Sequence, residues 1–133
     1  MSDTPFSTFN KVHAVAVECH MTTREMTPDQ QNAPAGDSYV QLRVENMLEA
    51  LQHWVTACAN HDDAMGPRGQ EVLRMAIDSM DELSSAHEVE VWTHQVRMQA
   101  LKVNVDWHPY FDMEANEQLL NALKYTGTTL PKK

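Results

Sequence analysis

The sequence predicts an all-α protein, a single-domain antiparallel bundle of four to five helices. Apolar residues recur at three- and four-residue steps through several long stretches, which is the spacing of one face of an α-helix. The connections between these stretches are mostly short, which favours antiparallel neighbours. A length of 133 residues suits one domain spanning residues 1–133 and is too short for two ordinary ones.

The N-terminal stretch is predicted to be a helix that ends before Pro28. Its apolar residues are Phe6, Phe9, Val12, Val15, Ala16, Cys19 and Met26. Because Val15, Val17 and Cys19 also alternate, a strand is the alternative. Residues 27–37 follow as a loop, because they carry Pro, Gly and amide residues, and a loop of this length is often functional.

Two amphipathic helices come next. The first covers residues 37–60, with Asp37 and Ser38 as candidate N-caps. Its apolar stripe consists of Val40, Val44, Met47, Leu48, Leu51, Trp54, Val55 and Cys58. The second runs from about residue 65 to Leu83, with Pro67 suited to its first position, and its outer face is strongly acidic.

A capping box formed by Ser85 and Glu88 predicts the start of a further helix that continues to about residue 103. One apolar stripe of this helix consists of Val89, Trp92, Val96, Ala100 and Val103, and a second stripe lies on nearly the opposite side. A helix that is apolar on two faces is central in its bundle or presents one face to a partner. Short strands at 88–92 and 103–107 are the competing interpretation.

The C-terminal quarter is predicted to hold an aromatic connector and one more helix. Residues 107–111 form the connector, in which Pro109 disfavours helical geometry at His108. The helix covers residues 112–124, with Gly127 as its stop signal, and residues 128–133 are expected to be frayed.

The charge of the chain points away from nucleic acid and anionic membranes as direct partners. Nineteen Asp and Glu residues against ten Lys and Arg residues give a net charge of −9 with neutral histidines. The acids are densest between residues 62 and 90, where we expect an electrostatic surface for a basic protein partner. Its residues are Asp62, Asp63, Glu71, Asp78, Asp81, Glu82, Glu88 and Glu90. A purely solvated acidic face is the alternative.

The second apolar stripe of residues 88–107, with the connector after it, is the other candidate binding surface. It contains Val91, Met98, Leu101, Val105, Trp107, Tyr110 and Phe111. Aromatic residues and Met are enriched at protein interfaces, so this set is a candidate partner or homo-oligomer surface. The alternative is that neighbouring helices of the same chain cover it.

No intact catalytic motif is present, so an enzyme is the less favoured class and no cofactor is expected. The adjacent pair His61 and Asp62 is a weak match to the metal ligands of helical phosphohydrolases. This alternative, a metal-dependent hydrolase, needs a further histidine and a distant aspartate. The candidates for those places are His13, His20, Asp106 and Asp112. Two pairs at i and i+4, Glu49 with His53 and Glu90 with His94, are interpreted as ordinary surface pairs.

The compartment signals favour the cytoplasm. The first residues lack the basic flank and apolar run of a secretory signal, and no apolar stretch approaches the length of a membrane-spanning helix. Cys19 and Cys58 match no disulfide or zinc pattern and are expected to be buried reduced thiols. The leading hypothesis is a small acidic cytoplasmic protein that binds another protein, as an inhibitor or adaptor that mimics nucleic acid on a basic surface. A homo-oligomeric structural protein is a further alternative.

Overall fold

The computed structural model describes residues 4–107, in which five helices and no strand occur, so the all-α prediction is confirmed. The helices are α1 (Pro5–Arg24), α2 (Pro28–Asn32), α3 (Asp37–His61), α4 (Met65–Asp78) and α5 (Ala86–Trp107). The strand alternatives at 15–19, 88–92 and 103–107 are wrong, because these residues lie inside α1 and α5.

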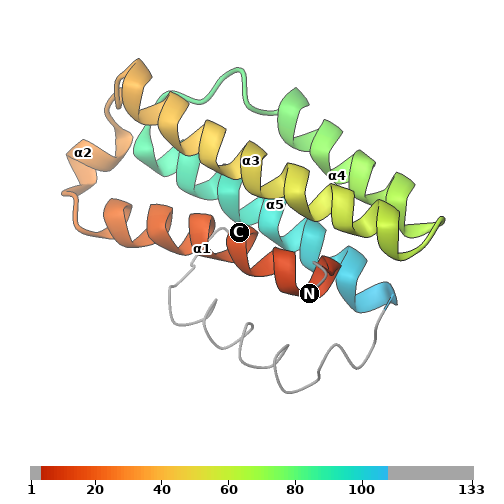
Figure 1. Ribbon diagram of the computed structural model, residues 1–133. Coiled ribbons are helices and arrows are strands. Elements are labelled where there is room, and N and C mark those ends of the chain that lie inside the picture. Colours follow the sequence, from red (N-terminus) through yellow and green to blue (C-terminus); the bar gives the residue numbers. More distant parts are fainter. Residues whose placement is uncertain (1–3, 108–133) are drawn as a thin grey trace.

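The four long helices run up, down, up and down (Figure 1). The helix α1 packs against α3 and α5, and α4 packs against the same two helices on the other side. Neighbours around this square are antiparallel, whereas α3 and α5 lie on its diagonal and run in the same direction. The antiparallel bundle predicted from the short connections is therefore the observed arrangement.

The segment predicted as a loop at 27–37 contains the short helix α2. Thr27 and Gln30 form a reciprocal capping box around Pro28, which occupies the first helical position. The chain then enters α3 through Gly36, whose φ of 91° suits a residue without a Cβ atom. Gly36, rather than Asp37 or Ser38, is therefore the N-cap of α3, which corrects the sequence prediction.

The helix α4 ends at Asp78, five residues before the predicted end at Leu83. The hydroxyl of Ser79 donates to the carbonyl of Met75 at 2.7 Å, and the indole N–H of Trp92 donates to the carbonyl of Ala76 at 3.2 Å. These side chains satisfy carbonyls at the helix end, so the backbone turns away toward α5. Pro67 is the third residue of α4 rather than its first.

The helix α5 begins as the capping box predicts and extends four residues beyond the predicted end at 103. The amide of Glu88 donates to Ser85 Oγ at 3.1 Å, and the carboxylate of Glu88 accepts from the amide of Ser84 at 2.9 Å. Near the other end, the buried Asn104 side chain accepts from the Trp54 indole at 3.1 Å and donates to the Pro5 carbonyl at 3.1 Å. These bonds tie the last turns of α5 to α3 and α1.

The core lies between the four long helices and is built from the predicted stripes. Its largest fully buried members include Phe9, Met47, Leu51, Trp54 and Met65. Cys19 and Cys58 are free and buried, as the sequence predicts. No helix within residues 4–107 has the length and apolar character needed to cross a membrane. The predicted 108–111 part of the connector, the helix at 112–124 and the frayed tail lie outside the described residues, and with them Tyr110, Phe111 and Asp112.

The helices α3 and α4 approach closely because α4 carries a glycine at their contact. A Cβ atom on Gly66 would lie 3.2 Å from the Cα atom of Ala59. We expect Gly66→Val to lower the free energy of unfolding by about 1–3 kcal/mol, because the backbone of α3 would have to shift. Gln70→Val places the same side chain on the exposed face of α4 and is expected to change stability by less than about 0.5 kcal/mol. Urea denaturation measures the free energy of unfolding of both variants. Equal losses in the two variants would contradict a close approach of α3 and α4 at Gly66.

Candidate functional site

The structure separates the predicted acidic residues into distinct places. Asp62 and Asp63 lie at the turn between α3 and α4, and Glu71 is exposed along α4. Four exposed acids surround the connection from α4 to α5, and we call them the acidic end: Asp78, Asp81, Glu82 and Glu88. The 14 residues of α4 separate the two groups by about 20 Å, so the eight acids do not form one patch.

Two of the predicted acids outside the acidic end make contacts within the fold. The carboxylate of Asp62 accepts from the amides of Ala64 at 2.7 Å and Met65 at 3.3 Å, so it caps the first turn of α4. Glu90 lies half-buried on α5, where its Oε2 contacts His20 Nδ1 on α1. These residues are therefore less available to a partner than the acidic end.

Within residues 4–107, no Lys or Arg side chain forms an ion pair with a carboxylate of the acidic end. The amide and hydroxyl of Ser84 donate to Glu88 Oε1 at 2.9 and 3.0 Å. These hydrogen bonds lower the pKa of Glu88 and hold its carboxylate in place. The connection is itself braced, because the amide of Ala35 donates to the Ser84 carbonyl at 2.7 Å.

The predicted second apolar stripe is largely packed within the chain. Leu101 is buried in the core, with 5% of its surface exposed, and three further members lie half-buried against that core: Met98, Val105 and Trp107. Val91 is half-buried beside the acidic end. The described part of the stripe therefore forms no continuous exposed surface, and its role toward a partner stays a prediction.

The residues proposed for a metal site have other partners. The ring of His61 packs edge-on against Phe6, with 5.5 Å between ring centroids. Asp62 caps α4, and Asp106 pairs with Arg68 at 3.0 Å. Among residues 4–107, no three His, Cys, Asp or Glu side chains gather in a way that could hold a metal ion.

A buried polar cluster between α1 and α5 is the feature that sequence reasoning missed. We call it the histidine–arginine cluster. Arg97 is only 4% exposed, and its Nη2 lies 2.8 Å from His94 Nδ1 and its Nη1 3.3 Å from His13 Nδ1. The contact between His20 and Glu90 continues the cluster along the same interface. The prediction that Glu90 and His94 form a surface pair is therefore wrong, because each contacts a different residue.

The histidine–arginine cluster keeps two imidazoles neutral. Burial, with the charge of Arg97 as the second cause, lowers the pKa of His13 to about 4. Burial, Arg97 and then His20 lower the pKa of His94 to about 4. Burial also lowers the pKa of Arg97 to about 10, which leaves it charged at neutral pH. Each neutral imidazole can then accept a hydrogen bond from the guanidinium.

The two thiols offer no nucleophile at neutral pH. Burial raises the pKa of Cys58 to about 12 and raises that of Cys19 as well. A thiolate is the reactive form of cysteine, so both residues act as small apolar groups here. The observation agrees with the apolar stripes on which the sequence places them.

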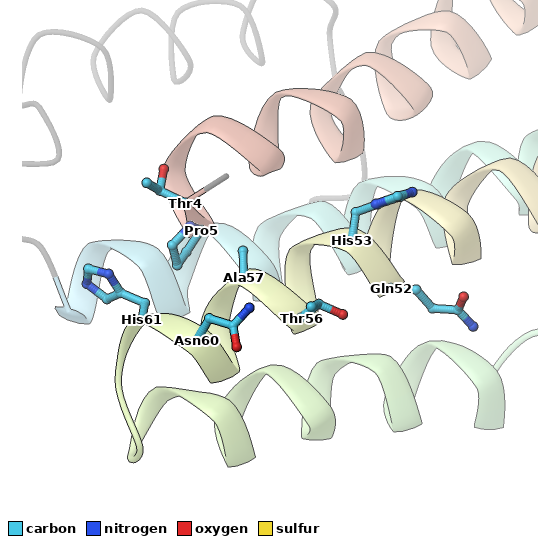
Figure 2. Close-up of a pocket in the computed structure, with 8 residues that line it drawn as sticks. All are labelled: Thr4, Pro5, Gln52, His53, Thr56, Ala57, Asn60 and His61. Carbon is cyan, nitrogen blue, oxygen red and sulfur yellow. The ribbon is translucent and has the colours of Figure 1, made fainter. Parts of the chain in front are cut away.

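A broad open hollow of about 620 Å³ lies between the start of α1 and the last turns of α3 (Figure 2). Thr4 and Pro5 come from the start of α1, while the remaining lining residues come from α3. In Figure 2 the rings of His53 and His61 point in different directions. Within the part of the chain that the structure describes, no carboxylate or thiol lines the hollow, so these residues do not supply the paired groups of an acid–base or nucleophilic centre.

Comparison with protein-family models, with curated proteins and with solved structures finds no match to this chain. Function is therefore inferred from the surface of the bundle and its charges.

Proposed function

We propose that the protein acts by binding another protein and that the acidic end contacts a basic surface of that partner. The observation that carries this proposal is the grouping of four exposed carboxylates around the α4–α5 connection, where no Lys or Arg among the described residues forms an ion pair with them. A net charge of −9 adds long-range attraction toward a positive surface. Complementary charge of this kind speeds association and selects against acidic partners.

The more specific form of the proposal is an inhibitor or adaptor that occupies the surface on which a basic protein holds nucleic acid. Carboxylates that are fixed in place present negative charge much as a row of phosphates does. Glu88 is the best example, because Ser84 holds one of its oxygens through two hydrogen bonds. We place this binding in the cytoplasm, in agreement with the free buried thiols of Cys19 and Cys58.

Charge reversal at the acidic end is expected to weaken binding by at least tenfold. The test measures the affinity of the purified protein for a panel of purified basic nucleic-acid-binding proteins, with duplex DNA as competitor. The binding variant is Asp78→Lys, Asp81→Lys and Glu82→Lys. The control variant makes the same change in net charge on other exposed acids, Glu45→Lys and Glu49→Lys on α3 and Asp63→Lys at the opposite end of α4.

The control variant is expected to bind within about threefold of the unmodified protein, because screening limits the reach of a surface charge to about 8–10 Å. Binding by the unmodified protein should also weaken as salt increases, and duplex DNA should displace it. The proposal fails if the panel shows no binding, or if the two variants lose the same affinity.

A further inference from the structure

An open hollow of about 360 Å³ lies beside the acidic end, between the end of α4 and the first turns of α5. Its lining is mixed, and its polar residues include His87. Leu83, Val91 and Trp92 form its apolar wall. Glu82 and Glu88 lie at the same hollow and are exposed to solvent. We call it the acid-rimmed hollow.

The wall of the acid-rimmed hollow is preformed. The indole N–H of Trp92 is shared between the Ala76 carbonyl at 3.2 Å and Ser79 Oγ at 3.0 Å, which fixes the orientation of the ring. Leu83 packs half-buried against the core and leaves part of its side chain exposed. A rigid apolar wall costs little ordering free energy when a side chain covers it.

The rim is preorganised as well. Ser84 holds the Glu88 carboxylate by hydrogen bonds from its amide and hydroxyl, both to Oε1. Glu88 itself is exposed to solvent. Together with Glu82, it offers acceptors for a cation at the edge of an apolar wall.

We propose that the acid-rimmed hollow binds a short segment of a partner in which an aliphatic side chain stands between Lys or Arg residues. The aliphatic group covers the exposed parts of Leu83 and Val91, which lie over the buried ring of Trp92, and the flanking cations pair with Glu82 and Glu88. This inference rests on the proposed function and adds specificity to it. Charge alone attracts any basic surface, whereas an apolar wall selects the segments that fill it.

The test uses three synthetic peptides that differ only in a central tripeptide, Arg-Leu-Arg, Arg-Ser-Arg or Glu-Leu-Glu, and follows amide and indole NMR signals of the full chain. We expect Arg-Leu-Arg to bind at least fivefold more tightly than Arg-Ser-Arg and to shift the signals of Val91 and the Trp92 indole. Glu-Leu-Glu is expected not to bind.

Val91→Lys is expected to remove the preference for leucine, because it places a charge against the apolar wall. The matched control is Ile77→Lys, which changes an apolar residue of α4 that is 42% exposed and does not line the hollow. The control should keep the preference. Thermal unfolding of both variants identifies any loss of peptide binding that comes from misfolding. Gln substitutions at Glu82 and Glu88 then test the rim in a chain with an unchanged wall.

Three results would overturn the inference. Equal affinity for Arg-Leu-Arg and Arg-Ser-Arg means that charge alone acts, which leaves the proposed function intact. No binding of any peptide removes the hollow as a site, while the protein panel still decides the proposed function. Shifts of the same signals with protein concentration, in the absence of peptide, assign the hollow to a second copy of the chain.

Discussion

Replacement of Trp54 by alanine is expected to lower the free energy of unfolding by about 3–5 kcal/mol. The indole is fully buried in the core, and its N–H donates to Asn104 Oδ1 at 3.1 Å. The substitution leaves a large cavity and removes the donor from a buried acceptor, and both effects are destabilising. The free energy of unfolding of small domains is only about 5–15 kcal/mol. Urea denaturation should therefore show a midpoint at a clearly lower urea concentration.

Two companion variants separate the two causes. Trp54→Phe keeps most of the ring volume but removes the N–H, so a smaller loss of about 1–3 kcal/mol is expected. Trp107→Ala removes an indole that is only half-buried at the end of α5 and should cost less than Trp54→Ala. A Trp54→Ala protein with the midpoint of the unmodified chain would contradict the central place given to this residue.

The repeating apolar pattern was sufficient to predict the helices but not where they end. The stripe from Val40 to Cys58 spans most of the 25-residue helix α3, and only a helix buries all of its members on one side. The ends depend on contacts between elements that are distant in sequence. Trp92 caps the end of α4 from the next helix, so the apolar pattern alone does not mark that boundary. Asn104 joins the last turns of α5 to α1 and α3.

The sequence predicted the charge of the candidate binding surface but not its shape. Acidic residues lie at the surface by default, and all four of the acidic end do. Their separation from Asp62 follows from the straight helix between them, whereas the inward position of Glu90 depends on His20 from another helix. The apolar wall beside them forms because α4 ends at Asp78, so that Leu83 lies in the connection to α5. The sequence pattern did not predict it, because it extends the helix to Leu83.

Arg97 was missed for a different reason. Arginine is rarely buried without a carboxylate partner, so a sequence pattern predicts that it is exposed. The available signal was the placement of His94 three residues before Arg97 on the same helix face, with His13 and His20 seven apart on another helix. Spacing shows that such residues share a face, but only the packing of α1 on α5 brings the two faces together.

Acidification is expected to destabilise the bundle between about pH 6.5 and pH 4. The folded-state pKa of His13 and that of His94 are about 4, below the ordinary value of 6.5, so the unfolded chain takes up protons first as the pH falls. Stability is therefore complete above about pH 6.5 and decreases toward the folded-state pKa values. Both imidazoles are only partly buried, so solvent screens part of the effect. We therefore expect the free energy of unfolding to fall by about 2–4 kcal/mol in total, less than the two pKa shifts would give without screening.

The double variant His13→Gln and His94→Gln tests this origin directly. Glutamine retains an acceptor for the Arg97 guanidinium but does not titrate, so the stability of this variant should depend much less on pH between 6.5 and 4. The control is His53→Gln with His61→Gln, which removes two exposed histidines of α3 and should retain the slope of the unmodified chain. Urea denaturation at half-unit pH steps measures all three proteins. If the first variant loses stability as steeply as the unmodified chain, groups other than the two imidazoles beside Arg97 cause the acid sensitivity.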